Sequence, residues 1–141
     1  MVLARYGCSI GLAERVVVTG GYWAPRQATL YTQLGWEADL PSLNTPRQGH
    51  ACGTFVNTDN QRVREYCRVQ AISCPNPSPS ILQVFLVVGG SLDNQHEEVL
   101  SSTEILTEGA AAWLQAGSLP RAAFNLRAVS INNSVFVTGT D

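Results

Sequence analysis

A short apolar stretch that ends in glycine occurs three times in the chain. The copies are residues 16–21, 85–90 and 135–140, which read Val-Val-Val-Thr-Gly-Gly, Phe-Leu-Val-Val-Gly-Gly and Val-Phe-Val-Thr-Gly-Thr. An apolar run rich in β-branched residues predicts a strand, and because successive positions are apolar, both faces of that strand should be covered. The repetition predicts an all-β protein built from similar units.

Glycine at the end of each run permits a positive φ and a close approach of the backbone. We therefore treat these glycines as structural positions of the repeat: Gly20, Gly21, Gly89, Gly90 and Gly139.

Two of the units also carry a tryptophan and an arginine at matching places. Trp36 and Trp113 each precede a Leu-Pro pair, and Arg47 and Arg121 each follow a proline. We expect both indoles to pack between neighbouring units, with stacking on a ligand as the alternative. We expect the arginines to tie connections together by hydrogen bonds to backbone carbonyls, with contact to a ligand as the alternative.

This order of Gly-Gly strand, tryptophan and Pro/Arg element resembles the kelch repeat, over nearly the whole chain except residues 58–84. The resemblance implies a partial β-propeller: two four-stranded blades and the inner strands of a third. The first blade would span residues 5–46, the second 47–120, and the start of the third 121–141.

The strands expected from this reading are short and regularly spaced. They cover residues 6–12, 15–19, 28–33 and a few residues near Trp36, then 49–56, 85–88, 102–106 and 113–115, and finally 126–131 and 135–138. Asn132 and Asn133 should form the turn of the last hairpin, because asparagine tolerates a positive φ.

Residues 64–84 interrupt the second unit, and without them two strands and a polar turn would restore the repeat. The end of this segment is rich in Pro and Ser, which is atypical of a central strand. We interpret residues 64–84 as an insertion within a hairpin, either a disordered or alternatively included segment, or a binding loop that carries Arg64, Tyr66 and Arg68.

Composition and charge narrow the class of protein. The chain is 45% hydrophobic and 14% charged, as in a globular domain, and its net charge of −2 provides no basic surface for nucleic acid or an acidic membrane. No apolar run approaches the roughly 20 residues of a membrane span. Residues 1–5 do not resemble a signal peptide, which weakly favours the cytoplasm.

The four cysteines have no dense disulfide framework around them. Cys8 and Cys52 lie on expected inner strands, where cysteine commonly packs as a small apolar residue. We expect free thiols at all four positions, with a Cys67–Cys74 disulfide as the alternative.

No catalytic or metal-binding constellation emerges. Residues 7–11 match G-x-S-x-G around Ser9, but the motif requires a strand, a sharp turn and a helix, and the surrounding pattern predicts strands. His96 lacks a second histidine at zincin spacing, and His50 lies on a repeat strand. We assign no catalytic residue, metal ligand or cofactor.

Kelch propellers commonly bind proteins, so the resemblance implies an interaction module that contacts an unidentified protein through inter-strand loops. The alternatives are a fragment of a propeller-fold enzyme, such as an oxidase or a sugar-modifying enzyme, and a non-functional truncated product. A blade cannot bury both faces alone. We therefore expect two open apolar faces and self-association through them.

Overall fold

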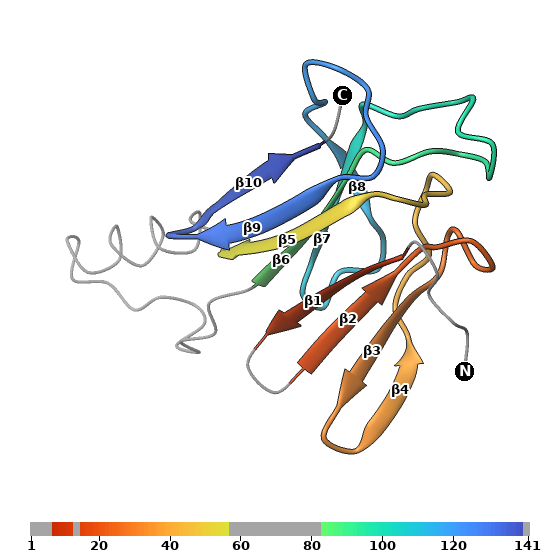
Figure 1. Cartoon of the computed structure of the whole chain (residues 1–141). Helices are drawn as coiled ribbons and strands as arrows, with labels where there is room; N and C mark the ends of the chain where they lie inside the picture. The colour runs from red at the N-terminus through yellow and green to blue at the C-terminus, as the bar shows by residue number, and fades with distance from the viewer. Residues whose placement is uncertain (1–6, 13–14, 57–82, 140–141) are drawn as a thin grey trace.

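The structure is a computed structural model of the 141-residue chain, and it describes residues 7–12, 15–56 and 83–139. These residues form ten strands in three antiparallel sheets, two of four strands and one of two, and no helix (Figure 1). The expected all-β class is confirmed. Since the described part of the chain contains no helix, none is present there that could cross a membrane.

The strands of each sheet follow one another in chain order. The first sheet contains β1 (Cys8–Leu12), β2 (Arg15–Thr19), β3 (Ala28–Thr32) and β4 (Gly35–Asp39). The second contains β5 (Ala51–Val56), β6 (Gln83–Val88), β7 (Thr103–Thr107) and β8 (Leu114–Ala116). The third contains β9 (Arg127–Ile131) and β10 (Ser134–Thr138).

The pairing register repeats from sheet to sheet. Cys8 opposes Thr19 in the first sheet, Ala51 opposes Val88 in the second, and Arg127 opposes Thr138 in the third. In each case the second residue of the pair directly precedes a glycine of the repeated motif. Position-by-position equivalence between the sheets follows from this register.

The second sheet is covered on both faces. Between it and the first sheet lies one core cluster: Ile10, Val17, Ala28, Leu43, Cys52, Phe85, Val87, Leu106 and Trp113. Its other face contributes Ala51 and Val88 to a second cluster with Leu126, against which Ala128 and Val137 of the third sheet pack. The apolar run in β6 was expected to be buried on both sides, and here it is. Within the described residues, the first and third sheets are each covered on one face.

The first glycine of each Gly-Gly motif follows the end of its strand, at a position where the surrounding atoms leave no room for a side chain. Gly20 and Gly89 have φ of 58° and 63°, and a Cβ at Gly20 would lie 2.5 Å from the carbonyl oxygen of Arg47. Asn132 and Asn133 have φ of 49° and 62°, which confirms the expected turn.

The predicted C-terminal boundary of the insertion, residue 84, is wrong. β6 begins at Gln83, and Val84 is buried, so residues 83 and 84 belong to a central strand. β5 pairs directly with β6 from Ala51↔Val88 to Val56↔Gln83. Residues 57–82 lie outside the described part of the chain, as do Arg64, Tyr66, Arg68, Cys67 and Cys74.

Candidate binding site at the loop edge

The long connections meet at one edge of the three sheets, which we call the loop edge. They are residues 20–27, 40–50, 89–102 and 117–126, and in Figure 1 they gather beyond the ends of β2 and β6. The opposite edge carries shorter described connections, at residues 33–34, 108–113 and 132–133. Because binding residues concentrate on loops held by a rigid scaffold, the loop edge is the place to look for a site.

Backbone hydrogen bonds fasten these connections to one another. The amide of Gly21 donates to the carbonyl of Arg47 (3.0 Å), and the amide of Arg47 donates to the carbonyl of Pro25 (2.8 Å). Gln48 and Ser91 exchange both backbone bonds, at 3.1 and 2.9 Å. The loop edge is therefore a connected surface that spans the first two sheets.

The Arg47 side chain is fully buried beneath this surface. Its Nε donates to Glu104 Oε2 (3.0 Å), and its Nη1 donates to the carbonyl oxygens of Gly89 and Ser102, both at 2.8 Å. Burial lowers the pKa of Arg47 from its ordinary value, while the carboxylate of Glu104 acts in the opposite direction. Arg47 makes the bonds to carbonyls that its place in the repeat predicts, and it is closed to a ligand.

Glu104 completes this anchor, and sequence reasoning missed it. Its Oε1 accepts a bond from the amide of Asn44 (2.7 Å), and its Oε2 accepts one from the amide of Thr45 (3.2 Å). One carboxylate thus holds both Arg47 and the connection that precedes it. The available signal was a lone acidic residue inside the apolar strand β7.

The two repeat tryptophans have different surroundings. Trp113 is 2% exposed, and its Nε1 donates to the carbonyl of Pro41 (2.7 Å) in the connection from the first sheet. Trp36 is 54% exposed and meets the ring of Tyr31 edge-on, with centroids 5.1 Å apart. The expected packing between sheets is found for Trp113 and not for Trp36, because in the described residues no sheet covers the face that carries Trp36.

The remaining repeat positions lie in the segment after β8 and at the end of β10. Arg121 is exposed on the 117–126 connection. A Cβ at Gly139 would lie 2.6 Å from Leu126 Cδ2, so this glycine allows close packing at the end of β10.

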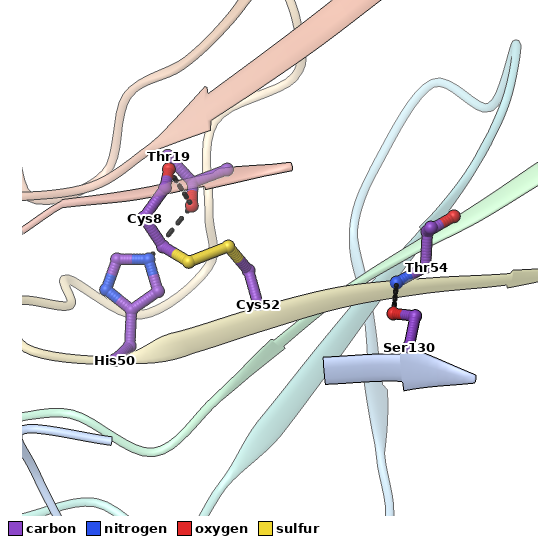
Figure 2. Close-up of a disulfide and its surroundings, with 6 residues drawn as sticks. All are labelled: Cys8, Thr19, His50, Cys52, Thr54 and Ser130. Atoms are coloured by element: carbon purple, nitrogen blue, oxygen red, sulfur yellow. Dashed lines mark hydrogen bonds between the residues drawn. A yellow bond between two sulfur atoms is a disulfide. The ribbon is translucent and has the colours of Figure 1, made fainter. Parts of the chain in front are cut away.

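His50 is buried between the two Gly-Gly motifs. Its Nε2 lies within hydrogen-bond distance of Thr19 Oγ1 (2.9 Å), and that hydroxyl lies 3.5 Å from the carbonyl oxygen of Cys8 (Figure 2). Burial, and secondarily the positive charge of Arg47, lower the pKa of His50 to about 3. The folded protein therefore holds a neutral imidazole at this position.

The second histidine belongs to a different contact. His96 Nδ1 lies 2.8 Å from Ser91 Oγ, and the ring stacks on Phe124 with centroids 4.3 Å apart. Within residues 7–12, 15–56 and 83–139, no group of three or more His, Cys, Asp or Glu side chains is placed to hold a metal ion.

A disulfide joins Cys8 to Cys52, which corrects the expectation of free thiols at these positions. It links β1 of the first sheet to β5 of the second, with Cα atoms 6.0 Å apart (Figure 2). The equivalent positions between the second and third sheets are Ala51 and Ala128, by the shared register. The sequence hid this pair because 44 residues separate the cysteines, and only the packing of two sheets brings them together.

The exposed part of the loop edge carries two aromatic residues beside a concavity. Trp23 is 69% exposed, and Tyr22 meets it edge-on with ring centroids 4.7 Å apart. The residues that follow, together with two from the 40–50 connection, surround a concavity of about 340 Å³. Its lining consists of Ala24, Pro25, Arg26, Gln27, Ala28, Leu40 and Ser42. Sequence reasoning assigned Pro25 to a loop but gave no role to Tyr22 or Trp23.

Comparison with protein-family models and with curated proteins found no match for this chain.

Proposed function

We propose that the chain is a kelch-type propeller segment that binds a protein partner at its loop edge. The observation that carries the proposal is the exposed Tyr22–Trp23 pair beside the concavity that includes Arg26. Tyr, Trp and Arg are the residue types enriched where binding energy concentrates in protein interfaces.

The backbone of residues 20–27 supports this role, because it is held at both ends. Gly20 N donates to the carbonyl of Gln27 (2.7 Å), and Leu43 N donates to the carbonyl of Arg26 (2.8 Å). Arg26 Nη1 also donates to the carbonyl of Asn44 (2.6 Å). A loop fixed in this way loses little conformational entropy when a partner binds.

The size and lining of the concavity favour a peptide segment over a large cofactor. A volume of about 340 Å³ is at the lower end of the range for small-molecule sites. Pro25, Ala28 and Leu40 offer apolar contacts, and Arg26 offers a positive charge. The segment that fits would place an apolar side chain in the concavity and an acidic group near Arg26.

Selection of displayed random peptides on the whole chain tests this proposal. A selected peptide should bind with a dissociation constant that rises at least about tenfold in Trp23→Ala, as expected for an interface hot spot. Leu34→Ala is the matched control, because Leu34 is 92% exposed but lies in the turn at the opposite edge. Failure to select any peptide, or equal binding by Trp23→Ala and the wild type, would contradict it.

A further inference from the structure

The first and third sheets lie on opposite sides of the second sheet (Figure 1), and within the described residues each has one face that no other sheet covers. Residues that oppose each other in an antiparallel pair lie on the same face, so Ser9 and Val18 share the outward face of the first sheet with Val16 and Tyr31. On the third sheet, Phe136 opposes Val129. Both are more than half exposed, which is unusual for paired apolar residues in a sheet.

The chain already builds one type of sheet-on-sheet contact twice. By the shared register, Val17, Leu86 and Phe136 occupy equivalent positions in β2, β6 and β10. Val17 packs in one cluster with Phe85 and Val87 of the next sheet. Leu86 packs in the other cluster with Val137 of the sheet after it.

Each of these contacts joins unlike faces. In both contacts the residue at this position, Val17 or Leu86, packs toward the two residues that flank the same position in the next sheet, namely 85 and 87, or 135 and 137. The two faces that no sheet covers in the described residues are again unlike. Phe136 and Val129 lie on a face that holds the Val17 position, whereas Val16 and Val18 lie on a face that holds the flanking positions. They are the two halves of a third contact of the same type.

We propose that the third sheet of one copy of this chain docks, head to tail, on the first sheet of a second copy. The side-chain sizes suit this arrangement. Phe85 and Trp113 are the bulky members between the first two sheets, where they share a cluster with Val17. At the new contact the bulky members would be Phe136 of the third sheet and Tyr31 and Trp36 of the first, and the first sheet also offers Val16 and Val18.

The charges are equally compatible. Equivalence with the Cys8–Cys52 and Ala51–Ala128 pairs places Arg127 of one copy opposite Ser9 of the next. Arg127 would thus meet an exposed hydroxyl, and among the described residues that share this face with Ser9 there is no side chain of like charge. A head-to-tail contact between copies continues until it closes into a ring or extends as a filament.

Sedimentation velocity of the oxidised chain over a wide range of concentration tests the proposal. The wild type should associate reversibly, and a non-reducing gel after alkylation should show that the association is not covalent. Ser9→Arg would set a like charge against Arg127, and Phe136→Glu would bury a charge in the opposite face. Each should raise the dissociation constant at least tenfold, whereas Ser9→Glu, which gives Arg127 a partner, should not.

Mixing the two blocked variants distinguishes this contact from a symmetric one. Ser9→Arg keeps an intact third sheet and Phe136→Glu keeps an intact first sheet, so an equimolar mixture should form a 1:1 dimer although neither variant associates alone. Val129→Ser replaces Phe136→Glu if circular dichroism shows that the latter is unfolded. A wild type that stays monomeric at every concentration, or a mixture that stays monomeric, would overturn the proposal.

Discussion

Glu104 helps to hold the first two sheets together. Both it and Arg47 are almost completely buried, and the pair joins the 40–50 connection to β7. A buried charge that loses its partner is strongly destabilising, because neither water nor a counter-charge then compensates it. The pair therefore holds the chain in place where it crosses from one sheet to the next.

Glu104→Gln should lower the free energy of unfolding by about 3–5 kcal/mol, because Arg47 would stay buried without a carboxylate. Glu108→Gln is the matched control: Glu108 pairs with Arg15 at 2.6 Å, but both side chains are partly exposed, at 31% and 40%. Such a surface pair contributes about 0–1 kcal/mol. Urea unfolding monitored by tryptophan fluorescence measures both values, and equal losses would show that burial does not matter here.

The roles of some individual residues could be predicted from the sequence, and the roles of others could not. Arg47 follows a proline at a repeat position, and its bonds to carbonyls agree with that placement. Glu104 and the Cys8–Cys52 pair depend on contacts across 57 and 44 residues, respectively. Neither has a local pattern, because their partners meet only after two sheets have packed.

The strands themselves were predictable from local pattern. β2 begins and ends where the apolar run predicts, and most other strands differ from expectation by one or two residues. Apolar runs, Gly-Gly stops and the Asn132-Asn133 turn are local features. The start of β6 was missed because Gln83 follows a Pro/Ser-rich stretch, and only its pairing with Val56 shows that it is a strand residue.

Trp113 and Trp36 occupy equivalent positions in two sheets, so replacing each one measures how much a covering sheet adds to the free energy of unfolding. Trp113→Ala should cost about 3–5 kcal/mol, since it removes a buried indole and its bond to Pro41. Trp36→Ala, at the equivalent position on the uncovered face of the first sheet, should cost about 1 kcal/mol or less, as substitutions at exposed positions usually do. Thermal melts followed by circular dichroism, at a protein concentration too low for the chain to associate, compare them, and a similar cost for both would contradict the exposure of Trp36 in the single chain.

At the scale of the whole molecule, the three sheets form a stack, and in the described residues the second sheet lies between the other two. The second sheet touches both others, and the clusters on its two faces share no buried residue. In repeat architectures of this kind, stability is approximately a sum of unit terms and nearest-neighbour contacts. The disulfide reinforces the contact between the first and second sheets, and alanines take its place at the contact between the second and third.

Cys8→Ala/Cys52→Ala should lower the free energy of unfolding by about 2–4 kcal/mol, because the disulfide closes a loop of 44 residues and restricts the unfolded chain. Alanine at both positions reproduces the pair found between the next two sheets, so packing should be preserved. Urea unfolding with and without a dithiol reductant provides the control. Reductant should destabilise the wild type and leave the double variant unchanged, and a wild type insensitive to full reduction would argue against the assigned role.

The position of this disulfide also affects how the protein responds to proteolysis. Cys8 and Cys52 bracket β2, β3, β4 and the whole connection to the second sheet, so the backbone between them and the disulfide together form a covalent ring. A protease that cuts once inside that ring opens it but releases no fragment. The nicked chain would keep its full mass on a non-reducing gel and divide in two only after reduction.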